Sequence, residues 1–366
     1  MSVWPNDRIR NLLGIDLPII QAPMAGPVLS EMVISVSEAG GLGSLPCALL
    51  SAEAAGAELA LVRKGTSKPI NLNFFCHHPP EASPERESVW KKRFAQYYLE
   101  LGLDPDAPVP SSSRTPFDRA TCELVLEFRP EVVSFHFGLP NKGLLAQVRA
   151  TGAKILSSAT SVEEARWLED HGCDAIIAQG FEAGGHRGMF LSDDVSTQVG
   201  TLALVPQVVD AVKVPVIAAG GIADARGIVG AFALGASAVQ IGTAYLFCPE
   251  AKLSPVHKRA LQNAKDNGTA LTNVFTGRPA RGIVNRVIRE VGPIADLAPD
   301  FPLAGGAVAP LRAKSEAAGS EDFVPLWSGQ AAHICRELPA SELTKRLAAD
   351  AIEQMKLFGS KDALAH

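Results

Sequence analysis

The chain has 366 residues, 47% of them hydrophobic, which is enough to bury one large core and carry additional segments. A net charge of -5, without a cluster of Lys and Arg, argues against sequence-independent binding of nucleic acid. No apolar run approaches the ~20 residues of a membrane span, and the charged N-terminus does not fit a secretory signal, so we expect a cytoplasmic protein.

Short runs rich in Val, Ile and Leu alternate with longer, helix-like segments, which is the pattern of βα units around a parallel sheet. Most of these runs are almost continuously apolar, as expected of strands that are covered on both faces. Eight units in succession favour closure into an α/β (β/α)8 TIM barrel over an open doubly wound sheet. The predicted strands are Pro18–Gln21, Gly41–Leu45, Ile70–Phe74, Val132–Phe137, Lys154–Ser158, Ala175–Gln179, Val214–Ala218 and Ala238–Ile241.

Two of the intervening helices carry recognisable start and stop signals. Ser161 precedes acidic residues in a predicted first turn, and Gly172 stands where a glycine closes a helix. In the same way, Asp224 precedes a predicted helix at Ala225–Leu234, which Gly235 ends.

Two segments fall outside the eight-fold pattern. Residues 77–116 are too long for an ordinary connection after the third strand, and 88–101 within them have apolar residues at helical spacing. We interpret that helical insertion as packed on the barrel wall, in preference to a subunit contact or a substrate lid. From about residue 254 we expect a C-terminal cap over the barrel mouth, ending in a packing helix at 341–357. Residues 1–253 would then form the barrel, and 254–366 would complete the same domain.

The loops that follow the strands of a parallel barrel gather at one face, and several unusual turns occur there. Ala22–Gly26, after the first strand, is either a simple tight turn or a place where backbone approaches a flat ligand. Ala219–Ile222 and Gly242–Ala244 follow the seventh and eighth strands, where barrels often bind phosphate through exposed amides. We therefore expect a phosphorylated ligand at this face.

Two histidines and two asparagines are predicted near the same face. His186 stands in the glycine-rich loop Gln179–Gly188 after the sixth strand, where an imidazole could accept a proton from a substrate. His136, at the end of the fourth strand, is either a hydrogen-bonded core residue or part of a substrate pocket. Asn71 and Asn73 alternate along the third strand and should face the same side.

The six cysteines do not add a further site, because no two of them form a Cys-x-x-Cys pair. Their spacing indicates neither a zinc site nor a disulfide framework, so no metal is expected. They are Cys47, Cys76, Cys122, Cys173, Cys248 and Cys335.

Taken together, these motifs resemble the nitronate monooxygenase family, formerly called 2-nitropropane dioxygenases, over essentially the whole chain, and its class I members in particular. The resemblance implies FMN as cofactor. Ala22, Pro23 and Met24 would line its ring, Asn71 and Gln179 would contact its polar edge or ribityl chain, and Gly184, Gly220, Gly221, Gln240, Ile241, Gly242 and Thr243 would hold the phosphate side. The matching motifs stand at 22–26, 71–74, 134–138, 179–188, 219–222, 240–243 and 326–330.

The implied reaction is oxidation of a small alkyl nitronate, such as propionate 3-nitronate, by FMN and dioxygen to a carbonyl compound and nitrite. His186 matches the family's catalytic histidine, the base for neutral nitroalkanes, and His136 and Phe301 would belong to the substrate pocket. Family members often have Tyr where this chain has Phe301, so a hydroxyl that could bind an acidic nitronate is missing. A homodimer is the candidate assembly.

Three other functions stay open. The first is an FMN-dependent NAD(P)H:quinone or enoyl-acyl-carrier-protein reductase on the same barrel. The second is a flavin-binding or regulatory barrel without turnover. A flavin-free isomerase or aldolase is disfavoured, because no lysine stands at a predicted strand end.

Overall fold

The computed structural model describes residues 3–81, 83–110 and 114–359, and its centre is one parallel sheet of eight strands. Their order is β1-β9-β8-β6-β5-β4-β3-β2, and a parallel bridge between Ile20 and Leu42 joins the two outer strands. The sheet therefore closes into a barrel. Its strands are β1 Ile19–Gln21, β2 Gly43–Pro46, β3 Ile70–Phe75, β4 Val132–His136, β5 Lys154–Ala159, β6 Ala175–Gln179, β8 Val216–Ala219 and β9 Ala238–Ile241.

The predicted (β/α)8 barrel is confirmed, and every predicted strand overlaps an observed one, with ends that differ by at most two residues. Alternate residues of each strand face inward and outward. On β4, for example, Val132 belongs to the cluster inside the barrel, whereas Val133 belongs to the cluster between sheet and helices. Both are fully buried, which explains why the strands read as continuous apolar runs.

Helices surround the barrel, and the two with predicted signals begin as expected. The Ser161 side chain accepts a hydrogen bond from the Glu164 amide at the start of α8, and Asp224 accepts from the Arg226 and Gly227 amides at the start of α10. Gly172 and Gly235 follow these helices with φ of 89° and 92°, the left-handed region that favours glycine. The outer helices are α2 Ser30–Glu38, α3 Ala52–Gly65, α6 Arg119–Phe128, α7 Lys142–Ala150, α8 Val162–Asp170, α9 Thr201–Ala211 and α10 Ala225–Ala233, while α1 Arg8–Leu13 lies against the interior cluster.

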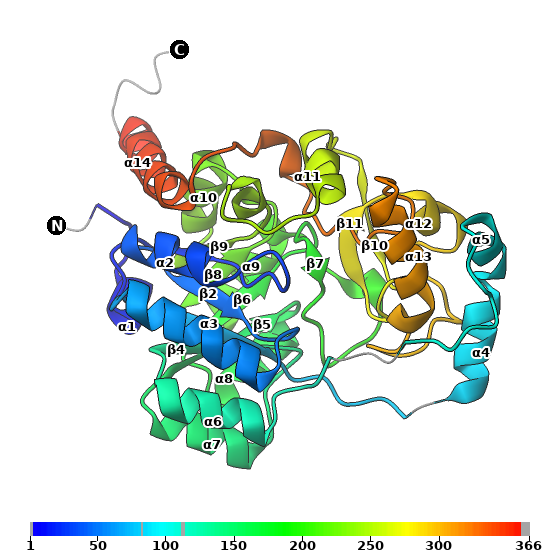
Figure 1. Ribbon diagram of the computed structural model, residues 1–366. Coiled ribbons are helices and arrows are strands. Elements are labelled where there is room, and N and C mark those ends of the chain that lie inside the picture. The colour runs from blue at the N-terminus through cyan, green and yellow to red at the C-terminus, as the bar shows by residue number, and fades with distance from the viewer. Residues whose placement is uncertain (1–2, 82, 111–113, 360–366) are drawn as a thin grey trace.

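The insertion after β3 differs from its prediction. It forms two short helices, α4 Pro84–Lys92 and α5 Ala95–Glu100, in place of one. They pack against α13 Gly305–Ala317, away from the barrel wall, at the right of Figure 1. Trp90 donates from Nε1 to the Ala304 carbonyl at 3.0 Å, and Tyr98 donates to the Ala307 carbonyl at 2.8 Å. The prediction of barrel-wall packing was wrong because the apolar face has its partner more than 200 residues later in the chain.

The C-terminal part returns to the mouth of the barrel. A small antiparallel sheet contains β10 Thr269–Thr272, β11 Ala280–Ile283 and β7 Gly185–His186, so a piece of the loop after β6 is paired with the cap. We use "the cap" for residues 264–328 together with α4 and α5; it has an apolar cluster of its own. Its other helices are α12 Arg286–Glu290 and α13, preceded in the chain by α11 Pro255–Gln262.

The final helix, α14 Ala340–Gly359, contains the predicted packing helix 341–357 and contacts α2 and α10 on the outside of the barrel (Figure 1). Short 3-10 turns complete the chain: η1 Val195–Thr197, η2 Thr243–Phe247 and η3 Ala332–Ile334. Within the described ranges, no helix combines the length and apolarity needed to cross a membrane.

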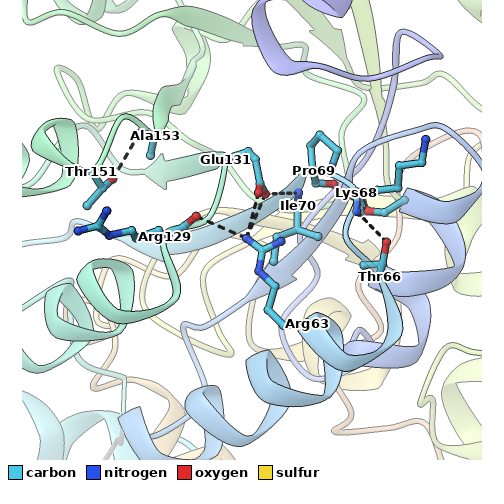
Figure 2. A network of polar contacts seen from close by, with 11 residues as sticks. Arg63, Thr66, Lys68, Pro69, Ile70, Arg129, Glu131, Thr151 and Ala153 are labelled. Carbon is cyan, nitrogen blue, oxygen red and sulfur yellow. Dashed lines mark hydrogen bonds and ion pairs between the residues drawn. The ribbon is translucent and has the colours of Figure 1, made fainter.

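A polar network fastens the opposite end of the barrel (Figure 2). Glu131, just before β4, accepts hydrogen bonds from the Ile70 amide and from Arg63, both at 3.1 Å. Arg63 comes from the end of α3 and also reaches the Arg129 carbonyl. Because this network lies at the amino ends of the strands, away from the loops where barrels carry out chemistry, its role is to hold α3, β3 and β4 together.

Candidate functional site

A cavity of about 380 Å³ opens at the carboxyl ends of the barrel strands. Its walls come from the turns after β1, β6, β8 and β9 and from the cap segment around Trp327. These turns are the ones in which the sequence predicted a flat, phosphorylated ligand. Twelve of the predicted site residues line the cavity: Ala22, Pro23, Met24, His136, Gln179, Gly184, His186, Gly220, Gly221, Gln240, Gly242 and Thr243.

Three predicted residues lie elsewhere. Ile241 is 1% exposed and packs in the core behind its strand. Asn71 is fully buried inside the barrel, where its amide donates to the hydroxyls of Ser44 and Ser134 at 3.0 and 2.9 Å while Oδ1 has no described partner. Its neighbour on the same face, Asn73, lines the cavity instead. Phe301 stands behind His186, with the ring centroids 5.3 Å apart.

The turns after β8 and β9 are suited to an anion. Among the described residues, the amide N–H groups of Gly221, Ile222 and Gly242 donate to no protein acceptor, and all three residues line the cavity. Gly220 and Gly221 adopt φ of 115° and 70°, so the backbone itself forms the wall. Amides without protein acceptors, just before helical turns, are a favourable environment for phosphate oxygens.

A segment of the C-terminal part closes this side of the cavity. The Gly329 amide donates to Thr243 Oγ1 at 2.9 Å, and a Cβ on Gly184 would come within 2.4 Å of the Gly329 nitrogen. Sequence reasoning marked the 326–330 motif but did not assign Trp327, Ser328 or Gly329 to the site. The motif itself could have indicated these residues. The loop that brings the motif to the barrel mouth, however, has no sequence pattern that predicts where it lies.

His186 occupies the centre of the site on β7, which pairs with Ala280 and Arg281 of β11. Its Nε2 lies 3.0 Å from Thr276 Oγ1, and the rings of Phe301 and Trp327 lie within 6 Å. Burial lowers the pKa of His186 well below its ordinary value, and the positive charges of Arg114 and Arg278 lower it further. The imidazole is therefore neutral at pH 7 and can accept a proton.

Side chains from the barrel strands hold the backbone of His186. Its carbonyl accepts hydrogen bonds from Gln179 Nε2 at 3.0 Å and His136 Nε2 at 3.1 Å, while Gln179 Oε1 accepts from the Gly188 amide at 2.7 Å. The other ring nitrogen of His136 meets Ser158 Oγ at 3.1 Å, and burial lowers the pKa of His136 to about 4. His136 is thus a hydrogen-bonded neutral histidine that also lines the cavity, which unites the two interpretations of the sequence.

Charged residues of the same loop anchor it to the barrel. Arg187 is fully buried and donates to the carbonyls of Gln179 and Gly180 at 2.7 and 2.6 Å. Glu182 accepts from the amide and hydroxyl of Thr201, both at 2.8 Å, at the start of α9. The hydrogen bonds of Arg187 and Glu182 therefore stabilise the conformation of the loop that carries His186.

The described residues contain no cluster of three or more His, Cys, Asp or Glu side chains able to hold a metal ion. Two cations stand near the imidazole. Arg114 lines the cavity and has its pKa lowered to about 10 by burial, and Arg278 is stacked 4.2 Å from the Phe137 ring. The site is therefore electropositive around a neutral base, an environment that favours an anionic ligand.

A model of the protein family described as nitronate monooxygenase matches residues 6–350, almost the whole chain. The chain belongs to this family. A nitronate monooxygenase of Pseudomonas aeruginosa is 42% identical over 93% of this chain and 98% of that relative. Membership in the nitronate monooxygenase family confirms the resemblance inferred from the motifs and makes the protein an oxidoreductase.

Solved structures agree with the assignment to the nitronate monooxygenase family. The nitroalkane oxidase of Streptomyces ansochromogenes is 38% identical, with a TM-score of 0.87 over 96% of this chain and 99% of that one. FabK of Thermotoga maritima is 28% identical, with a TM-score of 0.73 over 96% of this chain and 98% of that one. Both matches cover almost the whole length of each chain.

Proposed function

We propose that this protein is an FMN-dependent nitronate monooxygenase, which oxidises small alkyl nitronates with dioxygen to a carbonyl compound and nitrite. The observation that carries the proposal is a neutral, half-buried imidazole, His186, in an electropositive cavity whose wall also presents amides without protein acceptors. The relatives named for nitronate and nitroalkane oxidation support the same reaction class.

The residues fit FMN at three places. Gly221, Ile222 and Gly242 would hold its phosphate through free amides, and the small residues Ala22, Ala25 and Gly26 leave room for a flat ring. Gln240 Oε1 is a buried acceptor without a described partner, as expected of a group that bonds to a ligand. When bound, FMN supplies the electron acceptor that amino-acid side chains lack.

The chain's own residues would bind and prepare the substrate. Arg114 and Arg278 would stabilise the negative charge of a nitronate, because they create a positive potential around His186. A neutral nitroalkane would first lose its α-proton to the His186 imidazole, which is uncharged and lines the cavity. Phe75, Phe137 and Phe301 would exclude water from the side of the imidazole they cover.

The test is an aerobic assay of nitrite release by the FMN-loaded protein with propionate 3-nitronate and, separately, with a neutral nitroalkane. His186→Asn should retain FMN but lose about 100-fold or more in turnover of the neutral nitroalkane, since a general base contributes that much. Turnover of the preformed nitronate should fall less. Nitrite release from neutral nitroalkane at an unchanged rate would remove His186 from the mechanism.

The likeness to FabK keeps an FMN-dependent NAD(P)H:quinone or enoyl-acyl-carrier-protein reductase as the second candidate. The same preparation distinguishes them. Under anaerobic conditions NADH or NADPH should leave the flavin absorbance unchanged, whereas nitronate should bleach it. Rapid bleaching by a nicotinamide cofactor, without nitrite release from any nitronate, would select the reductase.

A further inference from the structure

The loop between β10 and β11 delivers a hydroxyl to the site that no motif predicted. Thr276 is 2% exposed, and its Oγ1 stands between two groups: His186 Nε2 at 3.0 Å and the Arg278 carbonyl oxygen at 3.3 Å. A hydroxyl carries one proton, and a carbonyl oxygen can only accept a hydrogen bond. If Thr276 donates to the carbonyl, it must accept from the imidazole.

We infer that Thr276 is a positioning residue that holds His186 in its Nε2–H tautomer, so that the Nδ1 lone pair is the base directed at the cavity. His186 lines that cavity, and among the described residues Nδ1 makes no hydrogen bond. The inference rests on the proposed function, because it assigns the atom of His186 that would take the proton. The α C–H bond of a nitroalkane breaks, its electron pair remains on the substrate as the nitronate, and the proton passes to Nδ1.

The loop that carries Thr276 is built to hold it in place. The Thr276 and Gly277 amides both donate to the Asn273 carbonyl, at 3.3 and 2.7 Å. The Asn273 side chain is fastened in turn by a reciprocal pair of hydrogen bonds with Ala295, at 3.0 and 2.9 Å. Gly277 has φ of 88°, and a Cβ there would come within 2.1 Å of the Pro299 carbonyl oxygen. The hydroxyl is therefore presented by a rigid turn of the cap.

The same contact assists the protonated state. Once Nδ1 has taken a proton, the imidazolium retains its Nε2–H bond to Thr276 Oγ1, and the hydroxyl dipole remains oriented toward the Arg278 carbonyl. Removal of the hydroxyl leaves Nε2–H without an acceptor in a buried site, so both the tautomer preference and the basicity of the ring should change.

The experiment uses the full chain saturated with FMN and labelled with ¹⁵N in the histidine rings. A long-range ¹H–¹⁵N correlation spectrum at pH 7.5 identifies the protonated nitrogen, and the spectrum of His186→Asn assigns the signals by their loss. We expect a neutral His186 with hydrogen on Nε2. In Thr276→Val, which is matched in shape, the two tautomers should mix, and Thr276→Ser should restore the native spectrum.

Kinetics supply the second readout. In Thr276→Val, kcat for a neutral nitroalkane should fall about tenfold, equivalent to about 1.4 kcal/mol, whereas turnover of the preformed nitronate should change less than about twofold. Thr276→Ser should retain the native rates. Hydrogen on Nδ1 of His186 in the native protein, or a valine variant with native tautomer and native rates, would overturn the inference. The tautomer is measured without turnover, so this outcome is distinct from failure of the proposed reaction.

Discussion

Asn71 and Asn73 project from the same face of β3, one step of the strand period apart, yet their surroundings differ. Asn71, nearer the amino end, bridges Ser44 and Ser134 within the packed interior. Asn73 bonds to the same Ser134 hydroxyl at 2.9 Å but also lines the cavity. Two positions on the same strand thus differ in role: Asn71 fills the barrel interior, and Asn73 lines the cavity.

This difference predicts opposite effects of two matched substitutions. Asn73→Ala should weaken FMN binding by about tenfold, because it removes a polar contact of the cavity wall. Asn71→Ala should leave FMN affinity nearly unchanged and lower the free energy of unfolding by about 1–3 kcal/mol, because the buried Ser44 hydroxyl loses the amide that donates to it. Fluorescence titration with FMN and urea unfolding measure the two quantities. Loss of FMN affinity in Asn71→Ala at native stability would show that Asn71 holds the cofactor, as the family resemblance implied.

Among the elements, α4 shows how the cap is held together. Trp90 is 1% exposed, stacks edge-on against Phe94 with centroids 4.9 Å apart, and bonds to the backbone at the start of α13. Its neighbour Val89 is 42% exposed on the same helix. Substitutions at these two positions therefore distinguish the packing of α4 against the rest of the cap from the stability of the helix itself.

Trp90→Ala should destabilise the protein by about 3–5 kcal/mol, since it opens a cavity and removes a buried hydrogen bond. Val89→Ala should change stability by less than about 0.5 kcal/mol. Urea unfolding followed by circular dichroism gives both values. If the two substitutions had equal effects, α4 would not be a docked element of the cap.

What could be predicted along the chain depends on how local the physical cause is. Strands covered on both faces produce apolar runs, and Ser161 or Asp224 caps its helix through amides three residues away at most, so these features were predictable. The glycine turns of the cavity belong to the same class. The partner of α4 was not predictable, because an amphipathic pattern reveals that a face is buried and not what covers it. Thr276 and Gly329 were not predicted as site residues for the same reason, because they reach the site only when distant segments pack together.

At the scale of the whole molecule, three imidazoles with lowered pKa values should make stability depend on pH. Burial lowers the pKa of His77 and His136 from 6.5 to about 4 each, and that of His186 moves in the same direction. Below about pH 6.5 the unfolded chain takes up protons that the folded protein cannot accept, so stability should fall as the pH drops toward 4. His77 and His136 should each contribute roughly 1–3 kcal/mol of that loss, and His186 should add to it in the same direction.

Urea unfolding at pH 7.5 and pH 5.0 measures this dependence. His77→Asn should reduce the difference between the two pH values, because it removes one of these imidazoles. An equal free energy of unfolding at both pH values would show that the folded protein takes up protons on these imidazoles at pH 5.0 as readily as the unfolded chain does.

The pairing of β7 with β11 means that His186 is covalently part of a barrel loop but structurally a strand of the cap's sheet. Its carbonyl accepts hydrogen bonds from Gln179 and His136 of the barrel, while its ring is hydrogen-bonded to Thr276 of the cap. Any separation of the two bodies would therefore pull the imidazole away from one of its supports. The imidazole is therefore held at both its backbone and its ring only while the cap is in contact with the barrel.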